Sequence, residues 1–219
     1  MAELVLIYGK SGSGKSRSLK NFAENEIFLI NVEGKRLPFK KKFAYQMTTD
    51  NYNTIVQKLS NMAQKTAIKT VVIDDAGYLL TNNFMRGHSS GRKGSQVFDL
   101  YNDLADNFWG LFKFIKNCLP SDIIVYLIMH EDTNDNGITK LKTIGKMLDD
   151  KACLEGMVTI CLRCASSDGK HFFKTVTDGY DITKSPEDMF ESDEIDNDLK
   201  FVDEKIREYY DLTERNDQK

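Results

Sequence analysis

Residues 9–16 have the sequence Gly9-Lys10-Ser11-Gly12-Ser13-Gly14-Lys15-Ser16, and this stretch decides the fold of the 219-residue chain. It matches the pattern G-x-x-x-x-G-K-[ST] at every fixed position. A short apolar run at residues 3–8 precedes it, and apolar residues at helical spacing over 15–24 follow it. Glycines there let backbone N–H groups surround phosphate oxygens, and the N-terminus of the next helix adds its positive dipole end. We therefore expect all eight residues to form a phosphate-binding loop between a strand and a helix.

The end of this loop and a later strand together predict a magnesium-bound nucleotide. Lys15 is expected to reach the β- and γ-phosphates, and the Ser16 hydroxyl to ligate Mg²⁺. Downstream, the apolar stretch Thr70–Asp74 ends in a carboxylate, the position from which an aspartate holds the magnesium shell. Ser16 and Asp74 are thus the expected magnesium ligands.

Strand-like and helix-like stretches alternate along the chain, which predicts an α/β fold with a mainly parallel central sheet and helices on both faces. Residues 26–32, 43–47, 70–74 and 123–129 are strand-like, and residues 52–63 and 97–118 carry apolar side chains at helical spacing. Two further stretches, 158–164 and 171–176, are joined by Ser-Ser-Asp-Gly and predict a hairpin at the C-terminal edge of the sheet.

The formal net charge of −3 hides a division along the chain. Residues 187–219 hold thirteen acidic and five basic side chains, net −8, so residues 1–186 carry +5. We predict one domain over 1–186 and an acidic tail over 187–219, an asymmetry typical of proteins that work with nucleic acids. Apolar residues at helical spacing in the tail predict an amphipathic helix with an acidic outer face, docked on the domain. The alternative is a partner-binding or autoinhibitory helix. The apolar residues are Ile195, Leu199, Val202, Ile206 and Tyr209.

The composition argues against membrane and secreted proteins. Hydrophobic residues make up 41% of the chain, but no apolar run approaches the roughly 18 residues needed to cross a bilayer. Residues 1–8 are too short and too acidic for a signal peptide, and four cysteines suggest no disulfide framework. We therefore expect a cytoplasmic protein that has no membrane partner.

Two more polar residues follow predicted strands. Glu33 comes after the strand at 26–32, and His130 directly follows the strand at 123–129. Ligands of parallel α/β sheets bind at the carboxyl ends of the strands, so both side chains are candidates for the same site as Asp74. Glu33 is expected to take a proton from an attacking water, and His130 to sense the γ-phosphate. Asp75, next to Asp74, is the alternative base.

This order of elements resembles the RecA-like ATPase core: a phosphate loop, a strand ending in Val32-Glu33-Gly34, a strand ending in Asp74 and a strand ending in His130. The resemblance implies ATP and Mg²⁺ as cofactors, with Lys15 and these three polar residues as the catalytic set. More narrowly, the chain resembles phage-encoded nucleotide-binding proteins of the compact RecA-core type, some of which act as single-strand annealing recombinases. That likeness implies an ATPase that binds single-stranded DNA, acts in recombination as a homo-oligomer, and works in the bacterial host cytoplasm.

In the RecA-like fold, DNA-binding loops follow the strand of the magnesium aspartate and the sensor strand. The first such segment here, residues 85–96, is basic, rich in glycine and serine, and free of acids, so we expect a mobile loop that contacts the phosphate backbone. The second, residues 131–145, has a mixed charge. The residues expected to contact DNA are Arg86, Arg92 and Lys93 in the first segment and Lys140 and Lys142 in the second.

Other basic residues have open roles. Residues 35–42 put five positive charges in eight positions, either near the nucleotide, at a subunit interface, or on a solvated loop. Lys184 and Arg163 are candidates for a finger inserted into a neighbouring subunit's ATP site, where a cation stabilises transferred charge.

Two other functions compete with the recombination ATPase. One is a phosphate-loop kinase of a small metabolite, with Arg86 and Arg92 forming an arginine lid. The other is a nucleotide-dependent assembly switch with little turnover. The acidic tail adds a further expectation, a contact with a single-strand-binding or replication protein, or competition with DNA for the basic surface.

Overall fold

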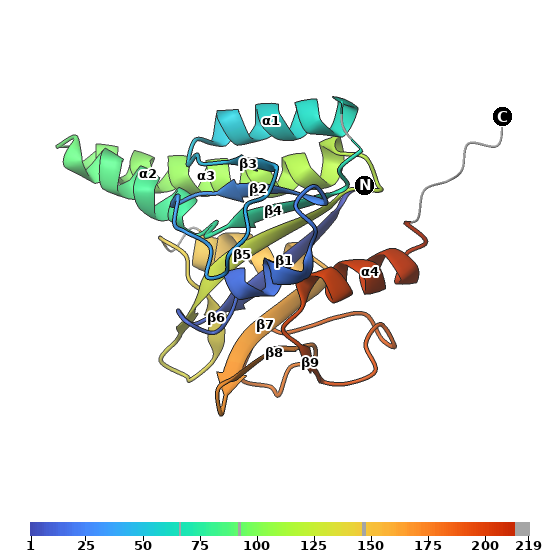
Figure 1. The fold of residues 1–219 in the computed structure, drawn as a ribbon. Helices are drawn as coiled ribbons and strands as arrows, with labels where there is room; N and C mark the ends of the chain where they lie inside the picture. Colours follow the sequence, from blue (N-terminus) through green and yellow to red (C-terminus); the bar gives the residue numbers. More distant parts are fainter. Residues whose placement is uncertain (66, 92, 146–147, 213–219) are drawn as a thin grey trace.

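A mainly parallel sheet forms the centre of the molecule (Figure 1). The computed structural model describes residues 1–65, 67–91, 93–145 and 148–212. Among these, the strand order is β3-β2-β4-β5-β1-β7-β8-β9, with β6 paired to β5. The strands are β1 (Glu3–Gly9), β2 (Ile27–Asn31), β3 (Tyr45–Met47), β4 (Thr70–Asp74), β5 (Ile124–Thr133), β6 (Thr139–Leu141), β7 (Ile160–Ser167), β8 (Lys170–Lys174) and β9 (Glu194–Asp196).

Helices cover both faces of this sheet, which confirms the predicted α/β architecture (Figure 1). The helices α1, α2 and α3 lie on one face, and α4 lies on the other together with a short 3₁₀ helix after the phosphate loop. The α-helices are α1 (Tyr52–Lys65), α2 (Tyr78–Ser89), α3 (Ser95–Cys118) and α4 (Leu199–Tyr209). The 3₁₀ helices span Ser16–Asn21 and Leu154–Met157, and a π-helical turn spans Leu148–Ala152.

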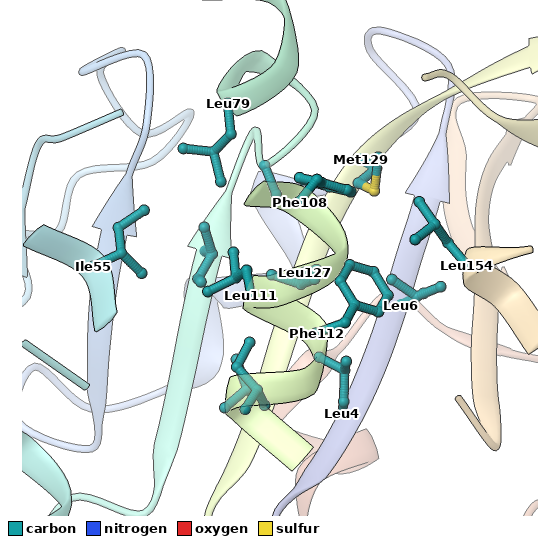
Figure 2. Packing of buried hydrophobic residues seen from close by; sticks show 14 of the residues in the cluster. Leu4, Leu6, Ile55, Leu79, Phe108, Leu111, Phe112, Leu127, Met129 and Leu154 are labelled. Atoms are coloured by element: carbon teal, nitrogen blue, oxygen red, sulfur yellow. The ribbon is translucent and has the colours of Figure 1, made fainter. Parts of the chain in front are cut away.

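Burial on both faces explains why the central strands are apolar almost throughout. In β1, Leu6 faces the α3 side while Ile7 packs in the cluster on the α4 side. Figure 2 shows Phe108 and Phe112 of α3 packed over β1 and β5, close to Leu6 and Leu127. All of these side chains are fully buried. Together they hold the strands whose ends form the site.

The stretch after the phosphate loop differs from the predicted α-helix. It forms the 3₁₀ helix Ser16–Asn21, which ends where Phe22 takes an extended conformation. The Ser18 hydroxyl donates to the Lys15 carbonyl, and the Ser18 N–H is shared between the carbonyls of Gly14 and Lys15. Such side-chain bonds compete with the regular helical ladder, which explains the tighter local winding.

The prediction of a mobile loop over residues 85–96 is wrong for most of that segment. Residues 85–89 complete α2, and residues 95–96 begin α3, which leaves only five residues between the two helices. The prediction failed because it interpreted the glycines as a sign of mobility, whereas Gly87 lies in a helix and packs against a neighbouring helix. A side chain on it would come within 2.4 Å of the Leu100 side chain, so the glycine lets α2 approach α3 closely.

The second predicted DNA segment is also more regular than expected. The strand β5 continues past His130 to Thr133 and pairs antiparallel with β6, so most of residues 131–145 form a hairpin. Hydrogen bonds around Asn134 close its tip. His130 therefore lies within a strand and not at its end.

The predicted C-terminal hairpin is confirmed. The strands β7 and β8 pair antiparallel around Asp168 and Gly169, whose φ angles of 51° and 74° are those of a tight hairpin turn. The outermost strand on this side is β9, which pairs with β8.

The C-terminal segment is docked on the domain, but the helix is shorter than predicted, because Ile195 lies in β9 and Tyr209 is 44% exposed. Asp198 caps α4 by accepting hydrogen bonds from the N–H groups of Lys200 and Phe201. The apolar face of α4 is fully buried in the same cluster as β1 and β5 through Leu199, Val202 and Ile206. The predicted division at residue 187 thus marks a change of charge, while the core continues through α4.

Among the described residues, no helix is both long enough and apolar enough to span a membrane.

Removing apolar volume from α4 should destabilise the whole domain. Ile206→Ala deletes a fully buried side chain, so we expect the free energy of unfolding to fall by about 2–5 kcal/mol in urea denaturation. The matched control is Glu204→Ala on the exposed face of α4, which should change it by less than about 0.5 kcal/mol. Equal effects of the two substitutions would mean that α4 is not part of the cooperative core.

Candidate active site

A cleft of about 310 Å³ lies where the carboxyl ends of β1 and β4 flank His130 of β5. The strand β5 pairs with both of the others in parallel, so their ends reach the same edge of the sheet. The residues around the cleft come from the phosphate loop, the start of the 3₁₀ helix that follows it, the loop after β2, the end of β4, and the strands β5 and β8. They are Ser11, Gly12, Gly14, Lys15, Ser16, Arg17, Lys35, Arg36, Leu37, Pro38, Asp74, Asp75, His130 and His171.

The backbone of the phosphate loop has the conformation that its glycines predict. Gly12 and Gly14 have φ angles of 81° and 104°, which favour glycine strongly. His171 of β8 packs against this loop, and its Nδ1–H group donates a hydrogen bond of 2.7 Å to the Ser13 carbonyl oxygen. A Cβ atom on Gly14 would meet the His171 ring at 2.8 Å. Sequence reasoning missed His171, because only the pairing of β7 with β8 brings it to the loop.

Two observations show that this loop suits a phosphate ligand. The Ser13 hydroxyl is buried and, within the described structure, has no hydrogen-bond partner. Lys15 is buried, and its ammonium group donates to the carbonyls of Gly9 and Lys10, both at 2.8 Å. Burial lowers the pKa of Lys15, and nearby acidic groups oppose that shift. An unsatisfied hydroxyl and a desolvated cation both gain from a bound anion.

Asp74 and Ser16, the two residues expected to bind magnesium, are in contact. Asp74 is buried at the end of β4, where it accepts hydrogen bonds from the Ser16 hydroxyl and from the Asp75 N–H. Burial and then the charge of Asp75 raise the pKa of Asp74 to about 6. Carboxylate and hydroxyl oxygens are the ligands that Mg²⁺ prefers, so this pair fits the ion. Over the described residues there is no cluster of three or more His, Cys, Asp or Glu that could hold a metal ion.

Asp75 lies at the centre of the polar contacts in the cleft. Its Oδ2 atom is 2.5 Å from the Lys35 ammonium, and its Oδ1 atom is 3.5 Å from His130 Nε2. Burial acts to raise the pKa of Asp75. Hydrogen bonds from His130 and Lys35, together with the charge on Lys35, outweigh that effect, so the pKa lies below its ordinary value. The other ring nitrogen of His130, Nδ1, lies 3.5 Å from the Lys15 ammonium. His130 thus links Lys15 to Asp75.

Glu33 does not join this group. Its Oε1 atom accepts a hydrogen bond of 2.8 Å from Asn82 of α2, and the same amide donates to Asp50 at 3.0 Å. Glu33 is absent from the lining of the cleft, which Asp75 does line. The sheet order explains this: Asn31 of β2 pairs with Asp74, so Glu33 lies beyond β4 on the side away from β1.

The residues expected to contact DNA lie in two separate places. Arg86 on α2 forms an ion pair of 2.7 Å with Asp50 and donates to the Asn83 side chain, while Lys93 is exposed between α2 and α3. Lys140 lies on β6, and the exposed Lys142 is the first residue after that strand, so both belong to the β5–β6 hairpin. Arg92 lies outside the described residues.

The two finger candidates contact their own chain. Arg163 of β7 donates to both carboxylate oxygens of Glu131 at 2.9 and 3.0 Å and lies 3.5 Å from Asp181. The backbone of Lys184 pairs antiparallel with Cys161. A role in a neighbouring subunit stays a prediction for both, and Arg163 would first have to leave two carboxylates.

The fold and the cleft define the chain as a phosphate-loop NTPase. A comparison with protein families matches residues 2–190 to the AAA domain. The chain therefore belongs to the AAA domain family, which makes it a nucleotide-binding P-loop ATPase of a class that typically uses ATP and Mg²⁺. A search of curated proteins found no match.

The burial of Asp74 should make the stability of the folded chain depend on pH. A pKa raised to about 6 means that the folded chain holds this proton more tightly than the unfolded chain, so stability is lost as pH rises from about 4 to about 6. Asp74→Asn removes that loss. Without Mg²⁺ or nucleotide, we expect the free energy of unfolding of the variant to exceed that of the parent by up to about 3 kcal/mol near pH 7.5. Near pH 4 the two free energies of unfolding should be similar.

Urea denaturation at the two pH values measures this difference. Asp99→Asn, at an exposed position on α3, is the control for loss of one negative charge. A constant difference between Asp74→Asn and the parent across the range would show that Asp74 titrates normally.

Proposed function

We propose that this protein is a RecA-like ATPase that binds single-stranded DNA and acts as a homo-oligomer in phage DNA recombination or annealing. The observation that carries the ATPase part is the continuous set of contacts from Lys15 through His130 to Asp75. It joins the cation expected at the γ-phosphate to a carboxylate that can face an attacking water. The basic segments and the likeness to compact RecA-core proteins support the DNA part.

Hydrolysis in this cleft would be an in-line attack of water on the γ-phosphorus, with the terminal phosphate leaving the ADP oxygen. Lys15 and the backbone N–H groups of the loop hold the phosphates and offset the charge that develops on their oxygens. Ser16 and Asp74 would hold a Mg²⁺, which would supply further positive charge against the charge on the phosphate oxygens. Asp75 orients the water and takes its proton. His130, in contact with Lys15 and Asp75, responds to loss of the γ-phosphate.

The geometry supports Asp75 better than Glu33 as the base, because only Asp75 lines the cleft and contacts His130. Asp75→Asn should lower the steady-state rate of ATP hydrolysis at least about a hundredfold, the scale of a lost general base, while ATP still binds. Glu33→Gln is the matched control, and we expect it to keep most of the rate.

Phosphate release, together with binding of a fluorescent ATP analogue, measures both steps. Loss of turnover in Glu33→Gln with normal turnover in Asp75→Asn would return the base to the position that the RecA-like resemblance implies.

Single-stranded DNA should increase the turnover of ATP if the two activities belong to one machine. We expect phosphate release to rise severalfold on adding an unstructured oligothymidine, and the nucleotide-bound protein to elute as an oligomer on size exclusion. Unchanged release together with phosphorylation of a small acceptor would favour the kinase. Oligomerisation without turnover would favour the assembly switch.

The acidic C-terminal segment supports one further part of the proposal, a single-strand-binding or replication protein as partner. Glu204 and Glu208 are exposed there, while the apolar face of α4 is buried in the core. The outer face of α4 has a mixed charge, since Lys205 pairs with Glu208, so a partner would meet both acidic and basic side chains on this helix.

A further inference from the structure

A second cavity, of about 560 Å³, lies next to the nucleotide cleft. It lies between the loop that follows β2 and the edge strand β3, and it shares three residues with the cleft. The shared residues are Lys35, Arg36 and Leu37. The lining is completed by Asn31, Gly34, Phe39, Lys40, Lys41, Lys42, Gln46, Met47 and Thr48.

The lining of this cavity has five basic residues and no acidic one. Arg36, Lys40 and Lys42 are exposed, and in the part of the chain that the structure describes they form no ion pair. Lys41 instead donates to the carbonyls of Lys20 and Phe22, which anchors the basic loop on the body of the domain. Three unpaired cations around one concave surface favour a ligand with several negative charges.

An aromatic side chain lies beside these cations. Phe39 lines the cavity and is held edge-to-face against the buried Phe43, with the ring centres 6.5 Å apart. Tyr45 of β3 is 46% exposed but does not line the cavity, so Phe39 is the aromatic side chain available there. Sites for single-stranded nucleic acids combine these two features, a basic groove for the backbone and aromatic rings on which bases stack.

We propose that this cavity binds the backbone of single-stranded nucleic acid, with phosphates at Arg36, Lys40 and Lys42 and a base stacked on Phe39. The inference rests on the proposed function and moves the main contact from the α2–α3 and β5–β6 segments to the edge strand β3. Contacts to phosphates and ring faces carry no sequence information, so binding is independent of sequence.

A small phosphorylated ligand fits this surface less well. Small-molecule sites bury most of their ligand and position a few polar groups around it. Here the three unpaired cations are exposed, and Lys41, the half-buried one, is already bonded to two carbonyls. An extended polyanion can bridge exposed cations along its backbone.

Lys35 connects this cavity to the nucleotide cleft. Its ammonium group lies 2.5 Å from Asp75 and 5.3 Å from the centre of the Tyr78 ring, and its side chain lines both cavities. An anion in either cavity therefore competes with Asp75 for the same cation. Because binding linkage is reciprocal, nucleotide and nucleic acid must then alter each other's affinity by the same factor.

The test compares two double variants of the full chain, each losing two positive charges. Lys40→Gln/Lys42→Gln removes cations that line only the second cavity, and Lys58→Gln/Lys113→Gln removes exposed lysines on α1 and α3. Fluorescence anisotropy of a labelled 30-mer oligothymidine, over a range of salt concentrations, measures binding. Binding of a fluorescent ATP analogue verifies that each variant is folded.

We expect Lys40→Gln/Lys42→Gln to weaken binding about tenfold or more at low salt, and to reduce the slope of log K against log[salt] by about 1.4, since each contact to a single strand contributes about 0.7. Lys58→Gln/Lys113→Gln should change neither quantity as much. Phe39→Ala should weaken binding at least about fivefold, and Phe39→Tyr should retain it.

Equal effects of the two double variants, or no effect of the first, would overturn the inference while the parent still binds the oligonucleotide. In that case Arg86 and Lys93 become the surface to test. Failure of the parent to bind oligothymidine would overturn the proposed function itself, so the two failures are distinguishable.

Discussion

The parallel pairing of β5 with both β1 and β4 is the constraint on which the rest of the site depends. Its register puts Gly9 of the phosphate loop opposite His130, and Ile73, just before Asp74, opposite Leu127. Parallel strands that share a register end at one edge of the sheet, so the loop, the histidine and the acidic pair meet there. The apolar contacts of α3 on these strands hold that register by burying one face completely (Figure 2).

Electrostatics then assigns different properties to neighbouring side chains in the cleft. Asp74 is buried beside the Ser16 hydroxyl and has a raised pKa, whereas Asp75 faces Lys35 and His130 and has a lowered one. Two adjacent carboxylates whose environments shift their pKa values apart can take separate roles, one at the metal and one at the water. Lys35 also extends the site, because it belongs to the wall of the basic cavity as well.

The errors of sequence reasoning have identifiable physical causes. Residues 85–96 contain glycines and no acid, a composition typical of a mobile loop, but Gly87 is where α2 packs against Leu100. The segment after His130 has turn residues at Asn134 and Gly137, yet they close a hairpin whose strands continue the sheet. In both cases local composition indicated a flexible backbone, but it did not reveal the neighbouring element that holds the segment in a regular structure.

By itself, the sequence determined the phosphate loop, the mainly parallel α/β sheet and an amphipathic C-terminal helix, because each follows from the spacing of apolar residues or from the backbone freedom of glycine. Only the tertiary structure decided that Asp75, and not Glu33, lines the cleft, that His171 packs on the loop, and that the basic residues 35–42 border a cavity beside the nucleotide. Those placements depend on which segments lie side by side in the folded chain, as Ser13 and His171 do although they are 158 positions apart, and no local pattern encodes that arrangement.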